Sequence, residues 1–382
     1  MFELPTDWRV ASETLLNMRL NLIADSERQL RLTTAKLPRL RCPCLVVACL
    51  LLLFVLGSCR SSTESSVTFD DFFITPVLEQ RTTTRAWRDI DVHKLFELSP
   101  DSFLNPIGVK VDRNGNIYVA DFGDMTVKRF GPDGTYKASY GEGSGQGPGE
   151  LISILDLGAV ADSLVYIVDN TARRILLFSF SGAFLRHEAY DTPPVRYQMT
   201  GGGRGYTLIS HNATLFRSQY GEEVTDFGAL VDNQTGHGYA LATGVIATHG
   251  EGMIYVPIHF PVIVRYNPDG SVAYARTTPD YGRAESPEWE TMDLGGTRAY
   301  RVMGGSLHGD VAVNEEEVFV HVLMPPDEDA IDVYRAETGD YVYSLRLPDS
   351  SGVIYTHVRD DRMYRIVETS DGGTLSVFGL TK

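Results

Sequence analysis

Cysteine is scarce in this chain and confined to its first sixth. Only four cysteines occur in 382 residues, and none follows residue 59. Cys42, Cys44 and Cys49 lie in one apolar segment, and Cys59 comes directly after it. Residues 60–382 can therefore form neither an internal disulfide nor a thiolate metal site.

Basic residues are also few. The chain has 34 Lys and Arg against 50 Asp and Glu, a net charge of −16. Residues 1–58 hold 7 basic and 5 acidic side chains, which leaves 27 basic and 45 acidic ones, a net charge of −18, in residues 59–382. Such a surface repels a phosphate backbone, so we expect no nucleic-acid partner.

The sequence motifs of common catalytic sites are missing as well. The chain contains no Gly-x-Ser-x-Gly elbow and no His-Glu-x-x-His pair, so the catalytic residues, if there are any, are unknown at this point. The glycine-rich stretch 141–150 lacks the lysine and the Ser or Thr of a phosphate-binding loop. We interpret this stretch as a connection between repeats.

The segment around the cysteines has the order of a secretory signal. Arg39 and Arg41 precede an apolar run from Cys42 to Leu56, and small residues then lead to Cys59. Leu56-Gly57-Ser58-Cys59 resembles the lipobox of bacterial lipoproteins. That resemblance implies cleavage before Cys59 and attachment of the protein to a membrane through lipid on the Cys59 thiol. The alternative is an uncleaved anchor helix.

These features predict three parts of the chain. Residues 1–58 are an N-terminal extension with a lipoprotein signal peptide, and residues 59–85 are the lipidated cysteine with a flexible Ser/Thr-rich tether. Residues 86–382 form the folded domain. The expected location is the bacterial cell envelope, at the outer membrane, with the domain outside the cytoplasm.

A repeat of about forty residues runs through the folded domain. Residues 104–140 contain four short apolar runs, 107–111, 117–120, 127–130 and 136–140. Asn114-Gly115 and Asp133-Gly134 separate them at two places, and such pairs favour tight reversals because they tolerate positive φ. One unit is therefore predicted to be a four-stranded antiparallel meander.

The unit recurs along the chain. Further copies span 154–190, 199–231, 244–276, 307–347 and 353–380, with the third copy the weakest. The central residues of the six second strands are Tyr118, Tyr166, Leu208, Tyr255, Phe319 and Tyr364. Successive central residues are 48, 42, 47, 64 and 45 positions apart.

This spacing predicts an all-β fold, a six-bladed β-propeller of four-stranded antiparallel blades. A β-sandwich is the alternative, and the weak third copy leaves five or seven blades open. Trp87–Leu98 is expected to pair with the last blade and close the ring. The gap of 64 residues predicts an insertion at about 279–300.

The first two units resemble the NHL-repeat family of six-bladed propellers. Pro106-Ile-Gly-Val-Lys-Val-Asp112, Gly115-Asn-Ile-Tyr-Val-Ala-Asp121, Val127-Lys-Arg-Phe130 and Asp133-Gly134 carry this resemblance. The whole chain looks like the six-bladed propeller lipoproteins of Bacteroidetes-type bacteria. The resemblance implies a fold and a location, and it leaves the activity open.

Five polar residues form a candidate metal site. They follow or end the second strands and are Asp121, Asp169, His211, His259 and His321. Imidazole and carboxylate suit Zn, Mn or Fe, so their convergence on the central channel would allow a divalent metal. The alternative is that each aspartate accepts hydrogen bonds from turn amides and that each histidine is an ordinary core or surface residue.

Two aromatic residues of the insertion, Tyr281 and Trp289, are candidates for contact with a partner because they lie outside the strand pattern. Packing against the propeller is the alternative. The leading functional hypothesis is an envelope-anchored binding or scaffold propeller for a protein, peptide or glycan. The alternative hypothesis is a metal-dependent hydrolase or lyase that uses the central channel, as the calcium-dependent lactonases of similar shape do.

Overall fold

The structure is a computed structural model of the chain. It describes residues 75–160, 162–211, 214–228, 243–281, 288–293, 298–303, 306–324, 328–348, 352–369 and 372–381. All of these belong to one compact unit, Ser65–Lys382. The predicted signal, Cys59 and the first part of the predicted tether lie outside the described residues. No helix in the described part is long and apolar enough to span a membrane.

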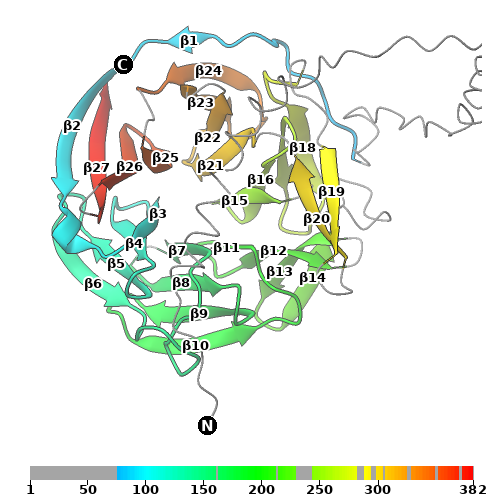
Figure 1. The fold of residues 1–382 in the computed structure, drawn as a ribbon. Coiled ribbons are helices and arrows are strands. Elements are labelled where there is room, and N and C mark those ends of the chain that lie inside the picture. Colours follow the sequence, from blue (N-terminus) through cyan, green and yellow to red (C-terminus); the bar gives the residue numbers. More distant parts are fainter. Residues whose placement is uncertain are drawn as a thin grey trace, which may run out of the picture. The chain divides into compact units, whose positions relative to one another are not determined.

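The described strands form an all-β propeller of six blades, as the repeat predicts (Figure 1). The second strand of the first blade shows why this sequence folds so. Ile117–Asp121 is buried along its whole length, because a second strand has sheet neighbours at both edges and another blade on each face. Gly115 and Gly134 have φ of +79° and +81° in the two predicted reversals.

The first three blades are consecutive four-stranded meanders. Their inner strands lie at the centre of the ring in Figure 1. The strands are β3 (Pro106–Val111), β4 (Ile117–Asp121), β5 (Thr126–Phe130) and β6 (Tyr136–Tyr140), then β7 (Asp156–Val160), β8 (Leu164–Asp169), β9 (Arg174–Ser179) and β10 (Phe184–Ala189), then β11 (Arg196–Met199), β12 (Gly205–His211), β13 (Thr214–Tyr220) and β14 (Glu223–Phe227).

The remaining blades follow the same plan with one exception. The sixth blade takes its outer strand from the beginning of the domain, where β2 pairs antiparallel with β27. The strands are β15 (Gly244–His249), β16 (Gly252–Pro257), β17 (Val262–Tyr266) and β18 (Val272–Thr277), then β21 (His308–Val313), β22 (Glu317–Met324), β23 (Glu328–Arg335) and β24 (Tyr341–Arg346), then β25 (Val353–Arg359), β26 (Arg362–Thr369), β27 (Gly372–Thr381) and β2 (Asp91–Leu98).

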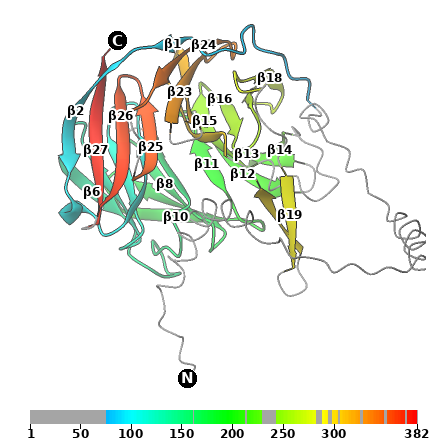
Figure 2. The same ribbon diagram turned by 45° about the horizontal axis from the view of Figure 1, so that its top comes forward.

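The predicted closure of the ring is confirmed, and it is more extensive than expected. Figure 2 shows β2 beside β27, and the register runs from Asp91 opposite Thr381 to Leu98 opposite Leu375. A short helical turn, η1 (Pro100–Ser102), then leads into the first blade. Before β2, the chain adds a further strand, β1 (Trp87–Arg88), parallel to β24 of the fifth blade. Closure thus ties the beginning of the domain to two blades.

The predicted flexible tether, 59–85, is wrong for its last residues. Leu78 forms a parallel bridge with Arg276 on the fourth blade. Gln80 is buried and donates its side-chain N–H to the Gly339 carbonyl oxygen at 2.7 Å. Arg85 is buried between two carboxylates. The sequence did not predict these contacts, because a segment that runs along the outer edge of a sheet has no hydrophobic periodicity of its own.

Among the described residues the core consists of six hydrophobic clusters, and each fills the gap between two blades. One joins the first blade to the second, for example, and another joins the sixth blade to the first. The other four occupy the remaining gaps around the ring. Because every blade packs against two neighbours, the inner strands are held rigidly around the channel.

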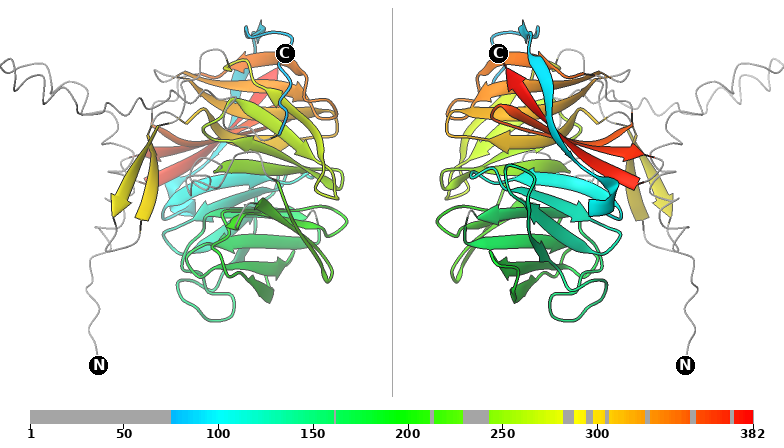
Figure 3. Two further views of the ribbon diagram at one scale, coloured as in Figure 1. Left: turned by 90° about the vertical axis from the view of Figure 1, so that its right-hand side faces the viewer. Right: turned by 90° about the vertical axis from the view of Figure 1, so that its left-hand side faces the viewer.

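The predicted insertion between the fourth and fifth blades contains a hairpin. β19 (Glu288–Asp293) pairs antiparallel with β20 (Arg298–Met303), and Trp289 stands opposite Val302. Figure 3 shows this hairpin standing apart from the blades. The insertion leaves the ring after β18 and returns at β21, so it lies where the inner strands begin.

Candidate functional site

A cavity of about 470 Å³ occupies one end of the central channel. Residues from the inner strands of all six blades line it, namely β3, β7, β11, β15, β21 and β25. Its rim is formed where these strands end, and Arg113, Glu251 and Glu315 are exposed there. The volume lies within the range of about 300–1,000 Å³ that is typical of small-ligand sites.

Three polar side chains from three blades meet at the cavity. Lys110 of β3 and His357 of β25 are part of its lining, and Asp310 of β21 joins them. The Lys110 ammonium donates to Oδ1 of Asp310. Oδ2 of Asp310 lies 2.6 Å from Nδ1 of His357. Side chains of Asp310 and His357 are each 4 % exposed, so water does not screen this triad of groups.

Burial and neighbouring charges together set the protonation of these groups. Burial opposes the charge of Lys110, but Asp310, Tyr355 and Asp156 outweigh burial and raise the pKa of Lys110 above its ordinary value. Burial favours a neutral Asp310, yet Lys110 and His357 hold the pKa of Asp310 well below its usual range. Burial lowers the pKa of His357. The cluster is therefore an ion pair with a neutral imidazole beside it.

The tautomer of His357 follows from this arrangement. A carboxylate only accepts hydrogen bonds, so Nδ1 of the neutral ring must carry the proton that is donated to Asp310. Nε2 is then an acceptor. It is buried and has no hydrogen-bond partner among the described residues. An orienting carboxylate, a fixed tautomer and an unpaired Nε2 also characterise histidines that act as general bases.

The cavity wall is held in place by further hydrogen bonds. Asp112 accepts from the amides of Asn114 and Asn116, each at 2.9 Å, and from the Tyr118 hydroxyl at 3.0 Å. The Tyr166 hydroxyl donates to Oε1 of Gln198 at 3.0 Å, across the boundary between the second and third blades. These contacts order the lining before any ligand binds.

The predicted site residues Asp121 and Asp169 have a structural role in the described structure. Asp121 accepts from the amides of Leu104 and Asn105 at 2.9 and 2.7 Å and from Lys128 at 2.7 Å. Burial opposes ionisation of Asp121, but its hydrogen bonds to Lys128 and to those amides lower its pKa.

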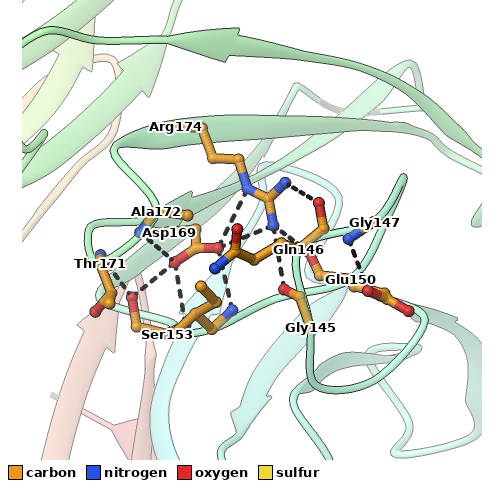
Figure 4. Close-up of polar contacts among 10 residues, drawn as sticks. Gly145, Gln146, Gly147, Glu150, Ser153, Asp169, Thr171, Ala172 and Arg174 are labelled. Atoms are coloured by element: carbon orange, nitrogen blue, oxygen red, sulfur yellow. Dashed lines mark hydrogen bonds and ion pairs between the residues drawn. The ribbon is translucent and has the colours of Figure 1, made fainter. Parts of the chain in front are cut away.

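Figure 4 shows the equivalent hub in the second blade, where Asp169 binds the amides of Ile152, Ser153 and Ala172 and the Arg174 guanidinium. Each aspartate thus joins the end of a second strand to the segment that enters the same blade.

The glycine-rich stretch is part of the hub around Arg174. The Arg174 guanidinium donates to the carbonyl oxygens of Gly145, Gln146 and Glu150, at 3.3, 3.1 and 2.8 Å (Figure 4). Because this loop turns carbonyl oxygens toward a cation, it lacks the converging N–H groups of an anion cradle. Its interpretation as a connection between blades agrees with these contacts.

The four predicted metal ligands whose side chains the structure describes, Asp121, Asp169, His259 and His321, are not grouped into a metal site. No three His, Cys, Asp or Glu side chains are grouped to hold a metal ion anywhere in the described ranges. His321 lies within β22, with Nε2 3.1 Å from Oδ2 of Asp329, and His259 lies in the loop after β16. His211 ends β12, and its side chain lies outside what the structure describes. The four described donors therefore do not form the predicted metal site, and a part for His211 in a metal site stays a prediction.

The reason is the topology of a blade. The sequence reasoning placed the ends of second strands at the channel, but the inner strands are the first strands of the blades, and these line the cavity. The cavity also lies at the end of the inner strands that is opposite to the end near Asp121 and Asp169. Its rim contains turns between first and second strands, whereas Asp121 and Asp169 precede turns between second and third strands.

The aromatic candidates of the insertion have different outcomes. Tyr281 is half-buried and packs against the core cluster between the third and fourth blades, and its contact with a partner stays a prediction. The side chain of Trp289 lies outside what the structure describes, and its proposed contact with a partner stays a prediction. The same holds for lipidation at Cys59.

Sequence reasoning missed Lys110, Asp310 and His357. Only one signal was available, namely a charged or polar residue at an inward position of an otherwise apolar first strand, as in Val109-Lys110-Val111. That signal points to a common site only once the ring is known to place the first strands of the first, fifth and sixth blades around one channel.

Comparison with known proteins agrees with this fold. Residues 103–130 match the family model of the NHL repeat. No curated protein matches the chain. Among solved structures, a protein of Bacteroides fragilis assigned to the exported proteins is similar, with a TM-score of 0.53 and 12 % identity over 80 % of this chain and 99 % of that one. At this identity the likeness shows the propeller fold alone.

Two further solved structures are similar at lower scores. A member of the DUF4221 family from Bacteroides vulgatus has a TM-score of 0.48 and 11 % identity, over 77 % of this chain and 99 % of that one. Virginiamycin B lyase from Staphylococcus aureus has a TM-score of 0.47 and 10 % identity, over 76 % of this chain and 99 % of that one.

Proposed function

We propose that this chain is a lipid-anchored protein of the bacterial cell envelope whose propeller is a binding module for a protein, peptide or glycan. The ligand enters the cavity at the end of the central channel. The observation that carries this proposal is the preformed, polar-lined cavity to which all six blades contribute. The signal-like segment before Cys59 supports the location, because its basic, apolar and small residues follow in the order of an export signal.

The test is a variant that fills the cavity. Thr248 lines the cavity from β15 and is half-buried, so Thr248→Trp should occupy part of the space without touching Lys110 or His357. Val272→Trp places the same ring on the exposed outer strand β18 and serves as the matched control. The full chain, purified in detergent, is immobilised and exposed to an extract of the producing cells' envelope, and retained molecules are identified by mass spectrometry.

A ligand retained by the wild type and by Val272→Trp, but not by Thr248→Trp, is the expected result. Equal retention by all three chains would place binding elsewhere and contradict the role of the cavity. Melting curves of the three chains establish that each is folded before retention is compared.

A second candidate function is a hydrolase or lyase that uses the same cavity. The paired His357 and Asp310 favour it, because a neutral imidazole with an unpaired Nε2 can accept a proton from a bound substrate. His357→Gln separates the two functions, since an amide keeps hydrogen-bonding capacity but cannot act as a base at neutral pH. If the retained molecule is recovered unchanged from the wild type, the enzyme candidate is rejected. If a product forms with the wild type but not with His357→Gln, the enzyme candidate replaces the binding module.

A further inference from the structure

Two residues of the cavity lining, both on one strand, carry an unpaired acceptor and an unpaired donor. Nε2 of His357 accepts, and Nε of Arg359 donates, and both are buried without a hydrogen-bond partner among the described residues. Nε of Arg359 lies 3.7 Å from Oδ2 of Asp360, which is an ionic contact without hydrogen-bond geometry. His357 and Arg359 are two positions apart on β25, so they lie on the same face of the strand, and both line the cavity.

Unpaired buried polar atoms define what a ligand must offer. Leaving a buried donor or acceptor unsatisfied costs about 1–3 kcal/mol. A ligand in the cavity removes that cost when the two side chains turn toward it and pair with it. Lys110 adds a further donor, because its side chain keeps 17 % exposure and its charge is balanced by Asp310. A hydroxyl group fits all three atoms, since it donates one hydrogen bond and accepts two.

The charges of the lining exclude a strong preference for an ion. Three cationic residues line the cavity, Lys110, Arg113 and Arg359, and three anionic ones, Asp112, Glu251 and Glu315. Asp112 accepts hydrogen bonds from Asn114 and Asn116 of its own turn, and Glu251 accepts one from the Thr200 hydroxyl at 2.9 Å. Balanced charges give no net field to attract a carboxylate, a phosphate or an amine.

The lining also differs from a surface that binds a protein or peptide. Such surfaces rely on large aromatic anchors that fill deep pockets. The described lining contains neither Phe nor Trp, and Gly158, Ala159, Ala247 and Gly250 make up part of it. Tyr118 and Tyr166 are present, but both rings are almost fully buried and their hydroxyls are already bonded.

We infer that the cavity binds a neutral, polyhydroxylated ligand, a sugar unit of a glycan, with a hydroxyl donating to Nε2 of His357 and sugar oxygens accepting from Arg359 and Lys110. This inference rests on the proposed binding function and narrows its ligand to one chemical class. The exposed rim lets the rest of the glycan leave the cavity at the face where the inner strands end.

The test uses the full chain on an array of neutral glycans printed beside acidic counterparts that carry uronate, sulfate or sialate groups. The peptides of digested envelope proteins are applied separately as competitors. We expect binding to neutral glycans, no tighter binding to the acidic counterpart of each, and no competition by peptides. His357→Phe should weaken binding about threefold to tenfold through loss of one hydrogen bond, and His357→Gln should retain more of it.

Each other result overturns the inference. Preference for acidic glycans, or displacement by peptides, rejects the ligand class and leaves the binding function intact. Equal binding by the wild type and by both His357→Phe and Thr248→Trp rejects the cavity as the glycan site. If the wild type binds no glycan but retains an envelope ligand that Thr248→Trp does not retain, only the ligand class is rejected. If the wild type binds neither a glycan nor an envelope ligand, the binding function is rejected too. Thr248→Trp keeps the test decisive if His357→Phe does not fold.

Discussion

Arg85 and Asp332 are 247 positions apart and form a bidentate ion pair. Nε of Arg85 donates to Oδ1 of Asp332, and a terminal guanidinium nitrogen donates to Oδ2, both at 2.9 Å. The Arg85 guanidinium also donates to the carboxylate of Asp280. The side chains of Arg85 and Asp332 are 2 % and 0 % exposed. One cation thus fastens the N-terminal strap, residues 75–88, to the fourth and fifth blades.

Removal of this cation should cost much of the stability of the domain. Arg85→Met leaves two buried carboxylates without their partner, so the free energy of unfolding should fall by about 3–5 kcal/mol. Urea unfolding followed by tyrosine fluorescence measures it. Arg81→Ala, an exposed change four residues earlier in the same strap, should alter stability by less than about 0.5 kcal/mol. Similar losses for both variants would contradict the role of Arg85.

Arg174 should control the order of the glycine-rich loop. Arg174→Met removes the donor that three loop carbonyls share, so amide hydrogen exchange in residues 141–150 should accelerate while the blade strands stay protected. Exchange measured by mass spectrometry checks this. The control is Arg186→Ala, which breaks an exposed ion pair with Glu188 on β10 and should leave the loop unchanged. Unaltered exchange in Arg174→Met would refute the assignment of the loop to this hub.

The fold could be predicted from the sequence because each of its signals is local. In the first blade, apolar runs and the Asn114-Gly115 and Asp133-Gly134 reversals fix four strands, and the observed bounds differ from the predicted ones by at most one residue at either end. Closure by β2 was predictable because one amphipathic segment was left over. The strap was not, since its anchor is a single charge, Arg85, within a polar segment.

The candidate site could not be predicted, because it is assembled from distant segments. Lys110 and Asp310 are 200 positions apart, and Asp310 and His357 are 47 apart. Each alone reads as an ordinary polar residue in a strand. Asp121 and Asp169 drew attention instead, because a carboxylate after a buried strand suits a ligand as well as a turn, and only their amide and cation partners distinguish the two roles.

Lipidation of Cys59 has a direct test. Cys59→Ala should abolish metabolic labelling of the chain with a radioactive fatty acid, because the other three cysteines lie within the segment that the lipobox resemblance predicts to be removed. Cys49→Ala is the matched control and should be labelled like the wild type. Labelling that survives in Cys59→Ala would reject the anchor and the proposed attachment to the membrane.

The neutral imidazole of His357 should make stability depend on pH. Burial, the largest effect, lowers the pKa of His357 in the folded chain, so at mildly acidic pH the unfolded chain binds a proton that the folded chain does not. The stabilisation is present above the ordinary histidine pKa of about 6.5 and is lost as the pH falls below it toward the folded pKa. Asp310 contributes in the same direction at lower pH, because Lys110 and His357 lower its pKa in the folded state.

His357→Gln removes this titration and should therefore flatten the fall in unfolding free energy between pH 7 and pH 5, by at most the slope of one proton. Urea unfolding at three pH values in that interval measures the slope. His93→Gln, a change on the exposed side of β2, is the matched control and should keep the slope of the wild type. If the wild type loses less stability than His357→Gln as the pH falls, the pKa of His357 is raised on folding and the ring is protonated in the folded chain. Its Nε2 would then be a donor, and the hydroxyl-accepting role inferred for it would fail.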